Sequence, residues 1–341
     1  MRPFARQSHP VRMPRVIYAF ALSFLTGVLL LTTFIGSSQA KDWEIYRLGG
    51  RDYVSDENVA KFYRFHGFTK EEKDRLFSHP ALVMTWTIGS QAIYVNETKF
   101  NLSFPVIESG GRALLSTVDL AKLVDPVLRP SQIKKFISFN TIVIDAGHGG
   151  HDSGAKGIQG HEKDYALDTA NRLKKALEAK GFKTVMTRSN DTFLTLGQRV
   201  DIANRTRNAI FVSLHYNASG SRTAQGIETY ALAPQGTRST NGGNPWNSLL
   251  SGNERDAENI ALATAVHAHI INELSPIDRG IKRARFNVLR GINKPAILFE
   301  GGFITNPTES KLVHDPAHRQ KIADSICNAV VNFKNAISSK R

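Results

Sequence analysis

The chain has 341 residues, of which 41% are hydrophobic and 22% charged, so it is neither disordered, collagen-like nor a polytopic membrane protein. A single cysteine, Cys327, excludes an intramolecular disulfide, a cysteine-rich zinc finger and an iron–sulfur cluster. The net charge of +14 favours an anionic partner, but no Lys/Arg-rich tail or RNA-binding motif is present, so we expect no nucleic acid partner.

The first 40 residues have the pattern of an export signal. They contain four arginines and no acidic residue, and the arginines precede an apolar run at 16–35. Small residues at Ser38 and Ala40 predict cleavage before Lys41. The alternative is an uncleaved membrane anchor, because a bilayer-spanning helix needs roughly 20 apolar residues. Both interpretations predict an exported protein, periplasmic, associated with the cell wall or secreted, with no membrane contact beyond this segment.

Residues 41–136 are expected to form a small α+β accessory domain. Short apolar or alternating runs at 92–95 and 102–106 are separated by turn residues, and Ser116 opens a short helical stretch. The string from Ala92 to Leu128 resembles the copper-amine-oxidase N-terminal-like domain of secreted bacterial proteins. The resemblance implies no copper site here. A wall-binding role and a simple spacer role both remain open.

From residue 137 to the C-terminus the pattern changes to alternating strands and helices. We expect strands at 141–144, 183–187, 209–214, 227–232, 287–289 and 296–299, and helices at 163–180, 198–206, 256–274 and 318–337. This succession predicts an α/β fold with a largely parallel sheet flanked by helices. Residues 233–255 are rich in Gly, Asn, Ser and Pro and are expected to form one long loop.

Four chemically capable side chains fall near the carboxyl ends of the expected strands. His148 follows the first strand, His215 the third, Glu300 ends the late strand, and Glu162 starts the first helix. In a parallel sheet this edge collects ligands, and catalytic zinc commonly has three His and Glu ligands. Taken singly, each histidine could instead simply form a hydrogen bond with a loop. Glu162 could instead be an acidic residue in a first helical turn that interacts with the helix dipole. Glu300 ends an apolar strand, where a buried charge needs a partner.

Several motifs resemble the zinc-dependent N-acetylmuramoyl-L-alanine amidases of the amidase-3 family. They include IDAGHGG, HEKD, SLHYN, DRGIKRARFNVLR and FEGGF, in the family's order. The resemblance implies an amidase-3-like fold, one Zn²⁺ per chain, and hydrolysis of the amide between N-acetylmuramic acid and L-alanine in peptidoglycan. It implies that His148, Glu162 and His215 are the zinc ligands and that Glu300 is the catalytic base.

Other functions stay open at this stage. The main alternative is a non-catalytic peptidoglycan-binding protein with the amidase fold, and a zinc peptidase that cuts within stem peptides is a third option. Asp145, Asp152 and Asn217 could orient ligands or contact substrate, although a plain loop hydrogen bond is the simpler role. The loop at 233–255 lacks the helical periodicity of the inhibitory insert of division-associated amidases, so we expect it to shape the substrate site. The sequence identifies no activator protein.

Overall fold

The computed structural model describes residues 43–134, 136 and 138–338. The predicted export segment lies outside the described residues. Within the described ranges, no helix combines the length and the apolar character needed to cross a bilayer.

Residues 43–134, here called the N-terminal part, contain two groups of strands. One small sheet has the order β1-β2-β9-β8, formed by β1 (Ile45–Leu48), β2 (Arg51–Ser55), β8 (Ile107–Ser109) and β9 (Arg112–Ser116). The other group is an antiparallel run of β3 (Gly67–Glu71), β4 (Asp74–His79), β5 (Leu82–Thr87), β6 (Ala92–Val95) and β7 (Thr98–Asn101). The helical segments are α2 (Asp56–Phe62), α3 (Thr117–Asp119), a π-helical turn (Leu120–Val124), α4 (Asp125–Leu128) and a 3-10 turn (Pro130–Gln132).

Two local predictions for the N-terminal part are confirmed and one is wrong. The strand at 92–95 is β6, and Ser116 caps α3 by accepting a hydrogen bond from the backbone N–H of Asp119. Residues 102–106 are not a strand. The buried Asp119 carboxylate accepts hydrogen bonds from the backbone N–H groups of Ser103 and Phe104. These N–H groups are therefore not bonded to a neighbouring strand.

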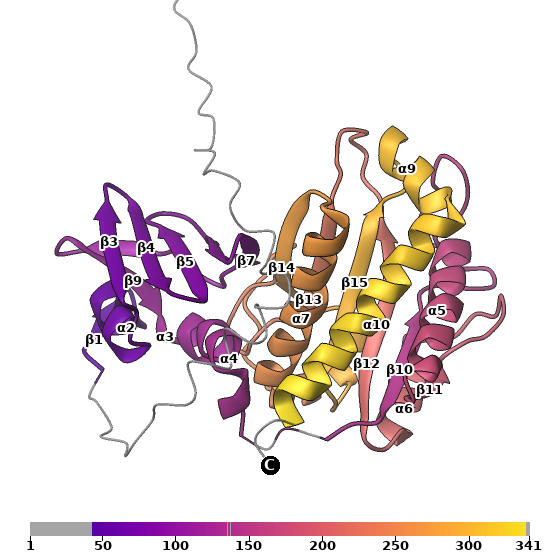
Figure 1. Ribbon diagram of the computed structural model, residues 1–341, viewed down its shortest axis with the longest axis horizontal. Helices are drawn as coiled ribbons and strands as arrows, with labels where there is room; N and C mark the ends of the chain where they lie inside the picture. The colour runs from indigo at the N-terminus through magenta and orange to yellow at the C-terminus, as the bar shows by residue number, and fades with distance from the viewer. Residues whose placement is uncertain (1–42, 135, 137, 339–341) are drawn as a thin grey trace, which may run out of the picture.

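Residues 138–338, the α/β part, place helices on both faces of a sheet. Its strands are β10 (Thr141–Ala146), β11 (Lys183–Met186), β12 (Ala209–Asn217), β13 (Ile227–Leu232), β14 (Asp278–Ala284) and β15 (Ala296–Phe303). Its main helices are α5 (Glu162–Ala179), α6 (Leu196–Arg205), α7 (Asp256–Leu274), α8 (Asn287–Gly291), α9 (Pro307–His314) and α10 (Pro316–Ser338), with a 3-10 turn (Ser251–Arg255) before α7. Helices α7, α10 and α5 lie side by side on one face (Figure 1), while α6 and α8 pack on the other.

The predicted α/β class is confirmed, but the sheet is mixed. β11, β10, β12 and β15 are parallel, whereas β13 runs antiparallel to β15, and β14 is parallel to β13. A short link at residues 218–226 returns the chain into β13 at the edge where β12 ends. The starts of β13 and β14 therefore lie at the same edge as the carboxyl ends of β10, β12 and β15.

This direction of β13 changes the role of the loop at 233–255. Because β13 ends at the opposite edge, the loop packs against the later part of β14 and against α8. Thr240 hydrogen bonds the Arg283 backbone, and the Trp246 ring lies under the Arg290 guanidinium. The expectation that this loop shapes the substrate site is wrong.

Two further elements differ from the predictions. Residues 287–289 belong to helix α8 and not to a strand. β14 was missed, because Ile281 and Ala284 are the only aliphatic residues in its sequence DRGIKRA. It is a strand because it pairs with β13 on one side and with β7 on the other.

The β7–β14 pairing joins the two parts of the chain into one sheet. The eleven strands have the order β11-β10-β12-β15-β13-β14-β7-β6-β5-β4-β3. The backbone N–H of Lys99 donates to Asp278 Oδ2 at 2.8 Å, and the Asn101 side chain donates to the Ile281 carbonyl at 3.2 Å. One hydrophobic core extends through both parts. The division at residue 136 remains a prediction, and the N-terminal part is packed as an extension of the sheet.

Candidate functional site

The first site loop leaves the end of β10 and is held by a buried ionic network. Asp145 accepts hydrogen bonds from Arg199 Nη1, Thr187 Oγ1 and Ser213 Oγ, each at 2.7 Å. Arg199 also donates to the carbonyl of His148 at 2.7 Å, and His148 has a φ of +60°. Of the roles left open for Asp145, the structure shows the simplest one, hydrogen bonds that hold the loop, since this carboxylate is 1% exposed.

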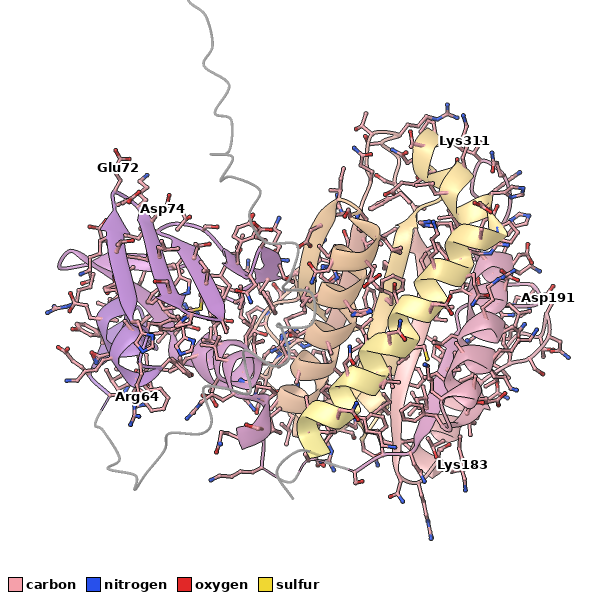
Figure 2. All side chains as sticks on the ribbon, viewed as in Figure 1. Arg64, Glu72, Asp74, Lys183, Asp191 and Lys311 are labelled. Atoms are coloured by element: carbon pink, nitrogen blue, oxygen red, sulfur yellow. The ribbon has the colours of Figure 1, made fainter. Side chains whose placement is uncertain are left out.

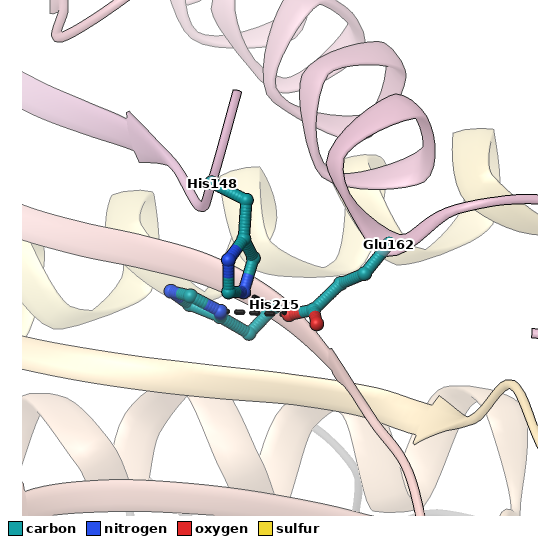
Figure 3. A group of neighbouring side chains, drawn as sticks. All are labelled: His148, Glu162 and His215. Atoms are coloured by element: carbon teal, nitrogen blue, oxygen red, sulfur yellow. Dashed lines mark hydrogen bonds and ion pairs between the residues drawn. The ribbon is translucent and has the colours of Figure 1, made fainter. Parts of the chain in front are cut away.

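Three predicted ligands from three separate elements meet at the carboxyl edge of the sheet. His148 comes from the loop after β10, Glu162 from the first turn of α5, and His215 from β12. One donor atom from each lies within 4.8 Å of the other two. Glu162 Oε1 is 3.0 Å from His148 Nε2 and 2.8 Å from His215 Nδ1, and Figure 3 shows the three side chains pointing toward one another.

Glu162 is held in place by the backbone as well as by the two imidazoles. The N–H of Ala155 donates to Oε2 at 2.9 Å, and the N–H of Tyr216 donates to Oε1 at 3.2 Å. Burial alone would raise the pKa of Glu162, but its hydrogen bonds with His148 and His215 hold the pKa well below its usual range. The carboxylate is thus kept ionised in a buried position.

Asp152 orients one of the two imidazoles. Its Oδ2 lies 2.9 Å from His148 Nδ1, while its Oδ1 accepts the backbone N–H of Gly154 at 3.0 Å. A histidine that ligates a metal usually binds a carboxylate through its other ring nitrogen in this way. Asp152 is therefore a positioning residue for His148, which is one of the three roles that the sequence left open.

Glu300 stands beside these three residues. On β15 it is the direct Cα partner of His215 on β12, so the two side chains share one face of the sheet. Its Oε2 is buried and has no hydrogen-bond partner among the described residues, and the same holds for Nδ2 of Asn217. Burial, reinforced by the charges of Glu162 and Glu228, raises the pKa of Glu300 well above its usual range.

A family model and several relatives match this part of the chain. The model of the Amidase_3 family, N-acetylmuramoyl-L-alanine amidase, matches residues 142–332. The chain belongs to this family. The amidase match contains all four candidate residues, and the resemblance to the copper-amine-oxidase N-terminal-like domain lies outside it.

Known amidases and one uncharacterised protein are similar over most of the α/β part. The uncharacterised protein YqiI of Bacillus subtilis is 33% identical over 223 residues, which are 65% of this chain and 98% of YqiI. The N-acetylmuramoyl-L-alanine amidase AmiA of Escherichia coli is 31% identical over 265 residues, with 67% of this chain and 90% of AmiA covered. The solved catalytic domain of the amidase CwlV from Bacillus (Paenibacillus) polymyxa is 32% identical, with a TM-score of 0.49, covering 57% of this chain and 98% of that domain.

Sequence reasoning missed two sets of charged residues in this amidase fold. Arg188 and Arg199 are nearly buried and bind backbone carbonyls of the loop that carries His148. Glu228 lies on β13 as the Cα partner of Glu300 and binds two basic residues of β14. A charge within the apolar run IETYAL was the signal for Glu228, because a buried charge needs a partner.

Proposed function

We propose that the chain hydrolyses the amide bond between N-acetylmuramic acid and L-alanine in cell-wall peptidoglycan, outside the cytoplasm. The observation that carries the proposal is the convergence of His148, Glu162 and His215 beside a second, unpaired carboxylate, Glu300. Family membership and relatives named N-acetylmuramoyl-L-alanine amidase support the reaction.

The donor set fits Zn²⁺. Two imidazoles and one carboxylate are a common ligand set for catalytic zinc, which keeps a further position open. His148 would be oriented by Asp152, and the backbone bonds to Glu162 hold its carboxylate toward the two imidazoles. When bound, zinc supplies a Lewis acid that lowers the pKa of a water molecule to about 7 and polarises a carbonyl. We therefore propose one Zn²⁺ per chain on these three ligands.

Glu300 is proposed as the general base and acid. Its Oε2 has no hydrogen-bond partner among the described residues, so we propose that this carboxylate takes the proton of the attacking water and passes it to the departing alanine nitrogen. Asn217 follows His215 by two residues on β12, so it faces the same side of the strand. Its unpaired amide is available to donate a hydrogen bond to the substrate carbonyl oxygen.

The decisive test is Glu300→Gln with purified peptidoglycan as substrate. We expect release of stem peptides to fall by about 10²–10⁴-fold, because a positioned general base contributes that much. Metal analysis should still find one zinc per chain. The exposed Glu273→Gln on α7 removes the same charge away from the site and should leave the rate unchanged. If Glu300→Gln releases peptides as fast as the unaltered protein, the assignment of the base is wrong.

The products separate this reaction from the two alternatives. An amidase releases stem peptides that begin with free L-alanine, whereas a peptidase leaves alanine on the glycan. Mass analysis of the fragments, with and without chelator, identifies the bond. A non-catalytic binding protein would bind peptidoglycan and release no fragment in either condition.

A further inference from the structure

A compact charge cluster lies next to Glu300. Glu228 is 3% exposed, and its Oε1 accepts hydrogen bonds from Arg279 Nε and, at 2.7 Å, from Lys282 Nζ. The Tyr230 hydroxyl donates to Oε2 at 2.5 Å. Two cations share one carboxylate, so the cluster carries one net positive charge at neutral pH.

Glu228 is the third member of a row of paired residues that crosses β12, β15 and β13 at the proposed site. His215 and Glu300 are Cα partners, and so are Glu300 and Glu228. Direct partners point their side chains to the same face, with Cα atoms about 5 Å apart. Arg279 and Lys282 reach back from β14 to the Glu228 carboxylate. Their charges therefore lie about one strand spacing beyond Glu300, on the same face.

Both cations keep donors for a further anion. The Arg279 side chain is 36% exposed and the Lys282 side chain 18%. Arg279 lies over the Phe303 ring, 4.8 Å from its centroid, which fixes the plane of the guanidinium. Among the described residues its Nη2 has no hydrogen-bond partner, so this atom is available to a bound group.

Three basic residues on the β10 and α5 side of the site are already engaged in other contacts. Arg188 and Arg199 are 4% and 3% exposed and are bound by backbone carbonyls and Asp145. The ammonium group of Lys163 is bound by Asp191, which projects from the α5 side of the molecule (Figure 2). These three cations are therefore held by other groups, whereas Arg279 and Lys282 are partly exposed beside Glu300.

We propose that Arg279 and Lys282 bind a carboxylate of the substrate, namely the α-carboxylate of the second stem residue. This inference rests on the proposed amidase function. Successive peptide Cα atoms are about 3.8 Å apart, so this carboxylate lies roughly 5–7 Å from the scissile nitrogen. Neighbouring strands lie about 4.8 Å apart. A carboxylate at this span from a scissile nitrogen near Glu300 therefore lies close to the cations on the far side of the next strand. The glycan side of the scissile bond carries no comparable anion, so the peptide extends toward β14.

The N-terminal part holds the strand that presents these cations. Asp278, which starts β14, accepts the N–H of Lys99 through Oδ2. Its Oδ1 lies 2.8 Å from Nε2 of the fully buried His267 and also accepts the N–H of Gly280. β7 therefore covers the outer edge of β14 and fixes the start of the strand on which Arg279 lies.

The test compares two muropeptides with the same tripeptide stem, one with an α-carboxylate and one with an α-carboxamide on the second residue. We expect the unaltered protein to cleave the carboxylate form with a kcat/KM at least about tenfold higher, chiefly through KM. Arg279→Gln and Lys282→Met should each reduce this preference. Each leaves Glu228 one cation and the Tyr230 hydroxyl. Lys174→Met, which removes an exposed charge paired with Glu178 on α5, should keep the preference.

The outcomes separate this inference from the function on which it rests. Equal cleavage of both muropeptides by the unaltered protein overturns the inference and leaves the amidase function intact. Equal losses on both substrates in Arg279→Gln also overturn it, because the cluster would then act through Glu300. If neither muropeptide is cleaved, the proposed function fails. Calorimetric binding of the two muropeptides to Glu300→Gln then still decides whether the carboxylate is recognised.

Discussion

Replacing Asp145 with asparagine tests how the loop that carries His148 is held. Asp145 is 1% exposed and forms an ion pair with Arg199, which is 3% exposed. Burial alone would raise the pKa of Asp145, but Arg199 and the hydroxyl groups of Ser213 and Thr187 keep it below the usual range. The carboxylate is therefore ionised at neutral pH, and asparagine would remove its charge while keeping its shape.

The expected loss is large because the guanidinium stays buried. Breaking a buried ion pair from one side costs about 3–5 kcal/mol, since the remaining charge loses its partner. Arg199 would keep its hydrogen bonds to the carbonyls of Ala146 and His148, so these two bonds would still hold the loop in the variant. Against a typical total stability of about 5–15 kcal/mol, such a loss is readily measured.

Urea unfolding followed by circular dichroism measures this change in the free energy of unfolding. Asp201→Asn on α6 is the matched control, because Asp201 is exposed and its ion pair with Arg205 spans 3.8 Å. We expect the control to lose less than about 1 kcal/mol. The double variant Asp145→Asn/Arg199→Met should recover part of the loss. A loss below about 1 kcal/mol in Asp145→Asn would show that the pair does not hold this loop.

Three further predictions concern metal, acid and the contact between the two parts. Removing metal with a chelator should lower the melting temperature and abolish peptide release, and added Zn²⁺ should restore both, because a ligand that binds only the folded state stabilises it. Burial alone would raise the pKa of Glu228, but its hydrogen bonds with Arg279, Lys282 and Tyr230 lower the pKa from 4.5 to about 2. Its contribution to stability is therefore complete above about pH 4.5 and is lost as the pH falls toward 2. Glu228→Gln should therefore flatten acid unfolding in that window, and an unchanged acid profile would contradict this. Gly280→Ala should cost about 1–3 kcal/mol, because φ is +96° and a Cβ would lie 2.6 Å from Asn101 Nδ2. Gly220→Ala, where a Cβ meets nothing within 4 Å, is its control in thermal unfolding and should change stability by less than about 0.5 kcal/mol.

Local sequence patterns were sufficient for most elements of the α/β part. The helix predicted at 256–274 is α7 with the same bounds, and the helix predicted at 163–180 is α5 to within a residue. These segments have long apolar periodicities and clear ends. β14 has neither, and its strand conformation depends on hydrogen bonds from β13 and β7, which lie far away in the sequence. No window of residues around 278–284 contains that information.

The candidate ligands could be named from the sequence because strand ends mark a shared edge of a sheet. His148, His215 and Glu300 lie at the ends of apolar strands and Glu162 at the start of a helix, and the family motifs added their roles. The cluster of Glu228 with Arg279 and Lys282 was not predictable in this way. It exists because β13 enters the sheet antiparallel to β15, which puts its first residues, and not its last, beside Glu300.

The amino-acid sequence alone determined the chemistry that is available: two imidazoles and two carboxylates at strand and helix ends, in motifs of one enzyme family. These features are local, because they depend on residue type and on short-range periodicity. Only the tertiary structure decided the direction of β13, the edge at which the loop 233–255 lies, and the continuation of the sheet into the N-terminal part. Those outcomes depend on pairing between strands that lie far apart in the sequence, such as β7 and β14. Every residue except proline offers the same backbone hydrogen-bonding groups, so these groups do not specify which strands pair.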